Sequence, residues 1–279
     1  MNFQNKTAIF ASNGKDIKIH ALSTGMVSVK SKFRESDKRG LLAKVEVFLD
    51  KKFTEWLPIW VWVIEHPEGI FIIDTGVSSN VMSKNYFQSS GAVAKWINTS
   101  LFRFKVQKED EIGAQLERLG INTNGAKVFL THLHLDHTDG LSYFKESTIF
   151  LHEKEWQKPY GNLPKLYPKW FKPVLLKLTD TFEDFDSISL TKSGDLLAIH
   201  TPGHSEGHIS ILLKTDNANI LFAGDVCYSQ NQIFENKIPG ANLSYGKTKE
   251  TYRKIRVLSE KKKLIILPSH NINAENGLN

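Results

Sequence analysis

The chain has 279 residues, a formal net charge of +6 and a single cysteine, Cys227. This length is sufficient to bury a substantial hydrophobic core, and one cysteine excludes an internal disulfide bond. The sequence has no apolar run of about 18 residues, which argues against a membrane-spanning helix, and its first residues lack the form of a signal peptide. The basic run Lys261–Lys263 has no interleaved aromatic residues, which argues against nucleic-acid binding. We therefore expect a cytoplasmic globular protein with neither a membrane nor a nucleic acid as its partner.

The first half of the chain is predicted to contain strands and one helix. Strands are expected over residues 17–31, 42–50 and 57–66, and the last of these is apolar on both faces and therefore buried. A helix is expected over Glu109–Leu119, where apolar residues recur on one face and Gly120 supplies a stop signal.

The second half contains short apolar segments that are bounded by glycine or proline and end next to residues able to bind metals. Strands are expected over Lys127–Leu130, Asp195–Thr201, Asn219–Ala223 and Lys263–Leu267. A histidine-rich run, His204, Asp225 and His270 follow these segments, in that order. Because loops at one end of a sheet carry the chemistry in many α/β proteins, we expect these side chains to meet. A helix-like stretch is also expected over Lys249–Glu260.

The run Thr131–His137 is the most informative segment, because it holds three histidines and one aspartate directly after an apolar strand. Residues two apart in an extended segment point the same way, so His132 and His134 can bind one metal from one side. Asp136 and His137 follow where the chain turns and can reach a second metal. Imidazole and carboxylate groups are ligands that Zn²⁺ favours.

Together these segments offer seven residues with metal-binding side chains: His132, His134, Asp136, His137, His204, Asp225 and His270. Two divalent metal ions with three or four protein ligands each, sharing one carboxylate, would use all seven. Such a pair leaves a coordination position for water, which a catalytic site needs and a structural site lacks. We expect zinc, although iron, manganese and cobalt accept the same ligands.

Several other residues are weaker candidates for a role at the metal site. Cys227 would share a face with Asp225 in an extended segment, but a small buried residue that points away from the metals is the preferred interpretation. Asp74 and His208 are expected to orient backbone or ligand groups, and His200 is a further candidate for that role. The remaining histidines are expected to be structural or on the surface: His20, His66 and His152.

The ligand pattern resembles that of the metallo-β-lactamase superfamily. The resemblance rests on the HxHxDH run at residues 132–137, on TPGH, AGD and PSH ending at His204, Asp225 and His270, and on Phe71–Gly76, which is similar to the superfamily's first motif. It extends from about Ile70 to His270. It implies an α/β fold of the αββα sandwich type, with two mixed sheets flanked by helices. We expect a single domain of this type over residues 1–279.

Asp225 and Tyr228 indicate which branch of the superfamily the chain resembles most. True β-lactamases lack a carboxylate at the position of Asp225, and the Asp-x-x-Tyr arrangement resembles the N-acyl-homoserine lactonases. The resemblance implies that Asp225 bridges two metals. It assigns one metal to His132, His134 and His204, and the other to Asp136, His137 and His270. A partly buried packing role is the alternative for Tyr228.

The resemblance implies a hydrolase that opens the lactone ring of N-acyl-homoserine lactones, which ends their action as quorum signals. A metal-bridging hydroxide would attack the carbonyl carbon, Tyr228 would donate a hydrogen bond to the developing oxyanion, and Asp136 would carry the proton to the leaving oxygen. Alternatives with the same metals are a phosphotriesterase or phosphodiesterase and a thioesterase. A metal-binding interaction module is a non-enzymatic alternative, and it would predict lost ligands where this chain has all seven.

Two apolar insertions, near residues 78–106 and 157–185, fall between the ligand motifs. Proline residues interrupt the second, which predicts broken helices. Either insertion could line a hydrophobic channel for an acyl chain, pack on the sandwich, or form a contact in a homodimer. The residues expected to bind substrate are Trp96, Leu135, Trp170 and Phe171.

Overall fold

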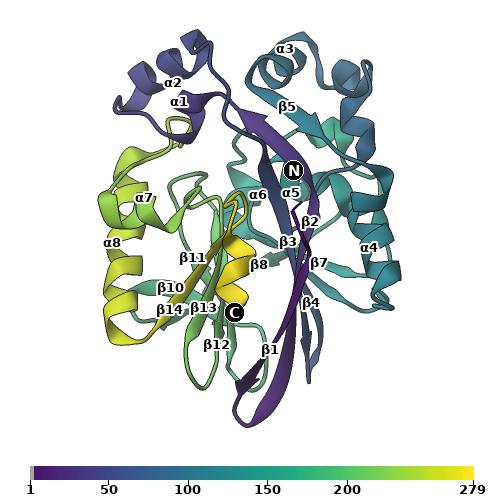
Figure 1. Cartoon of the computed structure of the whole chain (residues 1–279), viewed down its shortest axis with the longest axis vertical. Coiled ribbons are helices and arrows are strands. Elements are labelled where there is room, and N and C mark those ends of the chain that lie inside the picture. Colours follow the sequence, from purple (N-terminus) through teal and green to yellow (C-terminus); the bar gives the residue numbers. More distant parts are fainter. Residues whose placement is uncertain (1–2) are drawn as a thin grey trace.

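The computed structural model describes residues 3–279, and it consists of two β-sheets packed face to face with helices outside them (Figure 1). The αββα sandwich and its two mixed sheets are as predicted from the sequence. In this view α4 (Ile112–Arg118) flanks one sheet, while α7 (Gln230–Glu235) and α8 (Tyr245–Lys261) flank the other. Helices α2 (Gly40–Leu49) and α3 (Ala92–Leu101) lie at the upper end of the molecule.

The first sheet has the order β1-β2-β3-β4-β6-β7-β8, and β5 pairs with β2. Its strands are β1 (Lys6–Ser12), β2 (Lys15–Val29), β3 (Leu57–His66), β4 (Gly69–Ile73), β5 (Phe102–Lys105), β6 (Lys127–Leu130), β7 (Thr148–His152) and β8 (Val174–Leu176). Strands β1 to β4 pair antiparallel, whereas β4, β6, β7 and β8 run parallel.

The second sheet has the order β14-β13-β12-β11-β10-β9. Its strands are β9 (Asp180–Phe182), β10 (Phe185–Ser189), β11 (Leu196–His200), β12 (Ile209–Lys214), β13 (Asn219–Gly224) and β14 (Leu264–Pro268). Only the β13–β14 pair is parallel among the described strands of this sheet. The short helices are α1 (Ser31–Arg34), α5 (Leu135–Thr138) and α6 (Glu153–Gln157). The 3-10 turns are η1 (Ser79–Met82), η2 (Tyr86–Ser90), η3 (Lys108–Asp110), η4 (Asp139–Phe144), η5 (Pro164–Leu166) and η6 (Ala274–Leu278).

The main hydrophobic core lies between the sheets. Trp62 of β3 packs on Phe222 of β13 with ring centroids 5.4 Å apart, and both side chains are buried. The outer faces are also covered, by Ile112 and Leu116 of α4 on the first sheet and by residues of α8 on the second. Burial on both sides explains why β3 is a continuous apolar run, and its bounds match the predicted strand over 57–66.

Residues 42–49 belong to helix α2, so the strand predicted over 42–50 is wrong. Alternation of lysine, valine, glutamate and valine over residues 44–47 has the period of a strand, but the buried residues are Ala43 and Val47, which are four apart. That spacing places both side chains on one face of a helix. The strand predicted over Lys127–Leu130 is β6 with the same bounds. The remaining predicted elements are found with shifted ends; α4 begins three residues later than expected and is followed by Gly120 at φ +67°.

No helix within residues 3–279 is long and apolar enough to cross a bilayer. The region 157–185 contains no α-helix beyond the end of α6 at Gln157, and η5, β8 and β9 replace the broken helices that its prolines predicted. The single-domain organisation over residues 1–279 stays a prediction.

Candidate metal centre

The predicted ligand residues lie where strands of both sheets end. His132 and His134 follow β6, Asp225 follows β13 and His270 follows β14. These three strands each have a parallel neighbour, and parallel strands present their carboxyl ends at one edge of a sheet. His204 comes from the loop between β11 and β12. The packing of the two sheets brings all these loops together.

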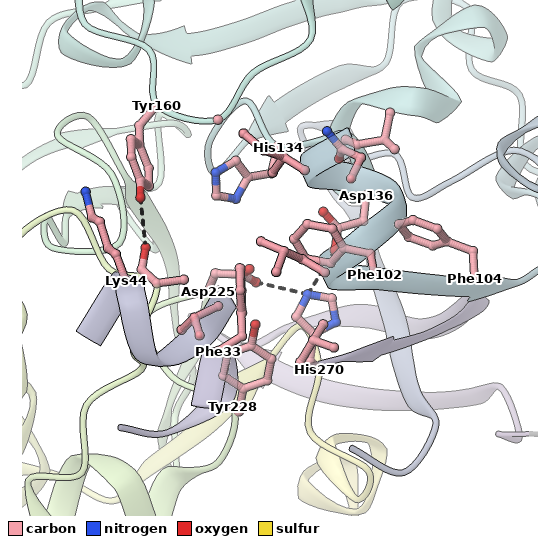
Figure 2. A pocket seen from close by; sticks show the side chains of 18 of the residues that line it. Phe33, Lys44, Phe102, Phe104, His134, Asp136, Tyr160, Asp225, Tyr228 and His270 are labelled. Atoms are coloured by element: carbon pink, nitrogen blue, oxygen red, sulfur yellow. Dashed lines mark hydrogen bonds and ion pairs between the residues drawn. The ribbon is translucent and has the colours of Figure 1, made fainter. Parts of the chain in front are cut away.

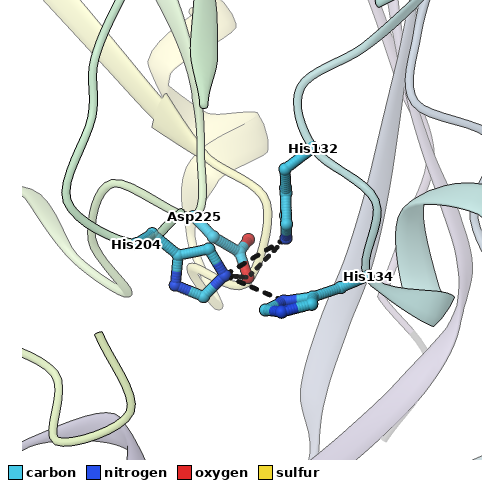
Figure 3. Close-up of side chains that lie close together, drawn as sticks. All are labelled: His132, His134, His204 and Asp225. Carbon is cyan, nitrogen blue, oxygen red and sulfur yellow. Dashed lines mark hydrogen bonds and ion pairs between the residues drawn. The ribbon is translucent and has the colours of Figure 1, made fainter. Parts of the chain in front are cut away.

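One group of ligand atoms consists of His132, His134, His204 and Asp225, all within 4.8 Å of one another (Figure 3). Nε2 of His204 lies 3.2 Å from Nε2 of His132 and 2.9 Å from Nδ1 of His134. Oδ2 of Asp225 lies 3.6 Å from Nε2 of His204. Three imidazole nitrogens and one carboxylate oxygen therefore converge on one point.

A second group consists of Asp136, His137 and His270. Nε2 of His270 lies 3.1 Å from Oδ2 of Asp136 and 3.4 Å from Oδ1 of Asp225. Nε2 of His137 lies 3.3 Å from the same Asp225 oxygen. Asp225 thus directs Oδ2 toward the first group and Oδ1 toward the second, which is the arrangement of a carboxylate that two cations share.

The donor set fits a divalent cation. Nε2 of His137 and Oδ1 of Asp225 are buried and have no hydrogen-bond partner within the described chain. Buried polar atoms without partners are costly, and converging lone pairs of imidazoles repel unless a proton or cation lies between them. A metal ion would satisfy these atoms, and nitrogen and carboxylate oxygen are suitable ligands for zinc.

Other side chains fix the orientation of the ligand histidines. Nδ1 of His137 lies 2.7 Å from Oδ2 of Asp74, and Asp74 also accepts a 2.8 Å hydrogen bond from the Thr131 backbone. Nδ1 of His270 donates to the carbonyl of Pro58 at 2.9 Å. These bonds leave the Nε2 atoms free to face a metal. The predicted orienting role of Asp74 is confirmed.

His208 holds the backbone of Asp225 in place. Its Nε2 accepts a 3.1 Å hydrogen bond from the Asp225 amide, and its Nδ1 lies 2.9 Å from the Thr201 hydroxyl. His208 therefore orients backbone, as expected. His200 does not share this role, because its Nε2 bonds to the carbonyl of Glu206 instead. Its ring lies beside that of His152, with centroids 4.8 Å apart.

The histidines of the two groups differ in the direction in which their surroundings shift the pKa. Burial lowers the pKa of His132 and His204, and it lowers the pKa of His134 to about 3, so these imidazoles are neutral and ready to bind a metal. Burial alone would lower the pKa of His270 as well, but Asp225 and Asp136 outweigh it and raise that pKa to about 10. His270 in the second group therefore holds its proton strongly, and a metal ion has to displace that proton in order to bind there.

A cavity of about 380 Å³ opens onto the centre, and His134, Asp136, Asp225 and His270 form one part of its wall (Figure 2). The rest of the wall is mainly apolar and is formed by Val29, Phe33, Lys44, Val47, Phe48, Ile97, Asn98, Leu101, Phe102, Phe104, Leu135, Tyr160, Gly161, Tyr228 and Ala241. Most of these residues come from α2, α3, β5 and the first residues of the 157–185 region.

Tyr228 and Leu135 line the cavity. The Tyr228 ring stacks on His270 with centroids 5.5 Å apart, and burial, followed by the nearby Asp225, raises the pKa of its hydroxyl well above the usual value. The hydroxyl is therefore protonated and able to donate a hydrogen bond. Cys227 is buried in the core beneath α8 and lies outside both ligand groups.

Three residues expected to bind substrate do not line the cavity. Trp170 and Phe171 pack against the core on the outer face of the first sheet. Trp96 lies on the surface and stacks on Phe48, which does line the cavity. Both insertions nevertheless contribute to the wall, but through other residues. Sequence reasoning missed Phe48 and Val47 because α2 was predicted as a strand. Tyr160 lies in the second insertion, which the sequence suggested as a channel wall.

Comparisons with known proteins agree with this arrangement. The family model of the metallo-beta-lactamase superfamily matches residues 124–270. The N-acyl homoserine lactonase of Bacillus cereus is 26% identical over 225 residues, covering 79% of this chain and 84% of that protein. The N-acyl homoserine lactonase AttM of Azorhizobium caulinodans is 26% identical over 232 residues, covering 78% and 83%.

Two solved structures share the fold. An N-acyl homoserine lactone hydrolase with the product N-hexanoyl-L-homoserine at its catalytic metal centre has a TM-score of 0.74, at 19% identity over 92% of this chain and 94% of that chain. AidC, a dizinc quorum-quenching lactonase, has a TM-score of 0.62, at 14% identity over 97% and 92%. The matched stretch 124–270 is just over half of the chain and contains all seven predicted ligand residues. The chain therefore belongs to the metallo-beta-lactamase superfamily.

Proposed function

We propose that this protein is a metal-dependent hydrolase that opens the lactone ring of N-acyl-homoserine lactones. The observation that carries the proposal is the shared carboxylate of Asp225 between two ligand groups, at the wall of an apolar cavity. The polar centre suits a lactone ring, and the apolar wall suits an acyl chain. The names of the curated relatives, which are N-acyl homoserine lactonases, support this substrate class.

We propose two divalent ions, with zinc as the expected metal. His132, His134 and His204 would hold one ion, Asp136, His137 and His270 the other, and Asp225 both. When bound, such ions lower the pKa of a coordinated water toward neutrality and polarise a carbonyl oxygen. The separate atoms that Asp225 presents to each group support a count of two.

Side chains of the cavity supply the remaining chemistry in this proposal. Tyr228, protonated and beside His270, donates a hydrogen bond to the oxygen that gains negative charge when the carbonyl is attacked. Asp136 accepts a proton from the attacking water and returns it to the ring oxygen as the ester bond breaks. Burial in the apolar cavity excludes bulk water and strengthens both interactions.

The proposal is tested by offering the zinc-loaded protein a panel of substrates and following proton release. The panel contains a short-chain and a long-chain N-acyl-homoserine lactone, a simple aliphatic lactone, a phosphotriester and a glutathione thioester. We expect the acylated lactones to be preferred and their turnover to be lost in Asp225→Ala. Turnover of the phosphotriester or thioester with the lactones left intact would overturn the substrate assignment.

A further inference from the structure

The outer wall of the cavity is formed by two lightly anchored helices. Helix α2 buries only Ala43 and Val47, and α3 buries only Leu101. The residues at or before their first turns, Gly40 and Gly91, have positive φ values of +55° and +91°. Elements with few buried apolar side chains open at low cost compared with core strands. This wall is therefore the part of the cavity that is best able to move.

Phe48 of α2 stands between the cavity and solvent, because it lines the cavity and is also 41% exposed. Its ring stacks on that of Trp96 from α3, with centroids 5.4 Å apart and an interplanar angle of 2°. Trp96 is 58% exposed and does not line the cavity. Trp96 thus supports Phe48 from outside and joins the two helices of the outer wall.

The lining residues beside Phe48 are apolar, so they favour hydrocarbon. Val47 belongs to the same helix, while Ile97 and Leu101 face the cavity from α3. Four of the candidate ligand residues form another part of the same wall, and these are His134, Asp136, Asp225 and His270 (Figure 2). An acyl chain whose head group lies at the centre would run along apolar side chains, and beyond Phe48 it would meet water.

We propose that the Phe48–Trp96 stack closes the acyl site and sets the longest acyl chain that the protein accepts. This inference rests on the proposed function for the identity of the head group. A chain that fills the cavity gains the burial of each methylene, which corresponds to roughly a fourfold gain in kcat/KM per methylene. A longer chain must displace Phe48 and break its stack with Trp96, so the gain stops at that length.

The test compares kcat/KM for N-acyl-homoserine lactones from butanoyl to tetradecanoyl, each divided by the value for the butanoyl substrate of the same variant. In Trp96→Ala, Phe48 loses its support, and we expect the length limit to rise by at least two methylenes. Phe48→Ala should give the same rise. The double variant should not exceed Phe48→Ala, because Trp96 acts through Phe48.

Trp156→Ala is the matched control. Trp156 is 43% exposed and packs on Phe171, away from the cavity, so it has similar exposure and a similar aromatic neighbour. An unchanged length limit in Trp96→Ala, or an equal shift in Trp156→Ala, would overturn the proposal. Thermal unfolding of each variant shows whether the fold is kept, and Phe48→Leu replaces Phe48→Ala if the latter does not fold.

Calorimetric binding of straight-chain fatty acids from hexanoate to tetradecanoate, to the zinc-loaded protein, separates the two proposals. If no lactone is opened but the fatty-acid length limit shifts in Trp96→Ala, the proposed function fails and the assignment of Phe48 and Trp96 stands. If lactones are opened but the longest accepted acyl chain is the same in the wild type and in Trp96→Ala, the proposed function stands and the assignment of Phe48 and Trp96 fails. Absence of both fatty-acid binding and lactone turnover would overturn both.

Discussion

Gly161 allows His134 to occupy its place in the first ligand group. A Cβ atom at Gly161 would lie 2.5 Å from Nε2 and 2.9 Å from Cδ2 of His134, whereas ordinary contacts begin near 3.4 Å. In Gly161→Ala the imidazole or the loop must therefore move by about 0.9 Å, the difference between 3.4 and 2.5 Å. Metal–ligand distances tolerate only about 0.2 Å, so we expect zinc affinity at this group to fall by roughly 10- to 100-fold.

The φ of +69° at Gly161 adds a backbone cost that must be separated from the clash. Gly194 provides the control, because its φ is +70° and nothing lies within 4 Å of the position a Cβ would take. Gly161→Ala and Gly194→Ala should lose similar stability, about 1–2 kcal/mol each. Only Gly161→Ala should weaken zinc binding.

Zinc binding is measured on metal-free protein by competition with a chromogenic chelator, alongside urea unfolding of both variants. Zinc affinity that is equal in Gly161→Ala and Gly194→Ala would refute the reasoning, because it would mean that His134 does not need its observed position to bind metal.

Three further predictions concern other parts of the site and fold. Asp74→Asn removes the charge that orients His137 and should lower zinc affinity by roughly 10- to 100-fold in the same chelator assay; unchanged affinity would contradict that role. Tyr228→Phe should lower kcat for lactone opening by roughly 10²-fold with unchanged metal content by atomic absorption, and an unaltered kcat would leave Tyr228 a packing residue. Burial and the adjacent His200 lower the pKa of His152 to about 4, from 6.5 when unfolded. The unfolded chain binds that proton more readily, so the free energy of unfolding should fall as the pH is lowered from 6.5 to 4, by on the order of 3 kcal/mol. His152→Gln should reduce this dependence on pH, as measured by urea unfolding. An equal pH dependence of stability in the wild type and in His152→Gln would refute the lowered pKa of His152.

The convergence of the candidate ligand residues could be predicted because each follows a short apolar strand, where the hydrophobic pattern and the metal-binding side chains occur together. The run from His132 to His137 needs no knowledge of distant contacts, and His204, Asp225 and His270 follow strands bounded by glycine or proline. Strand β3 was located to the residue because burial on both faces gives it a continuous apolar sequence.

The cavity wall could not be predicted in the same way, because it depends on packing between segments far apart in the chain. Residues 44–47 have the alternation of a strand, and only the burial of Ala43 and Val47 in the folded chain shows that they share a helical face. Trp96, Trp170 and Phe171 were expected at the substrate because large apolar residues suit a channel. The same property lets Trp170 and Phe171 cover the first sheet. The cytoplasmic location and a homodimer also stay predictions.

In the proposed function, two metal ions that share the carboxylate of Asp225 are required for opening N-acyl-homoserine lactones. The most direct measurement adds zinc stepwise to metal-free protein and follows both bound metal and hydrolysis of N-hexanoyl-homoserine lactone. We predict that two ions bind per chain, that turnover reaches its maximum only with the second, and that Asp225→Ala abolishes turnover and weakens binding of both ions. Full activity with one ion, or two bound ions with the lactone left intact, would rule out a two-metal lactonase.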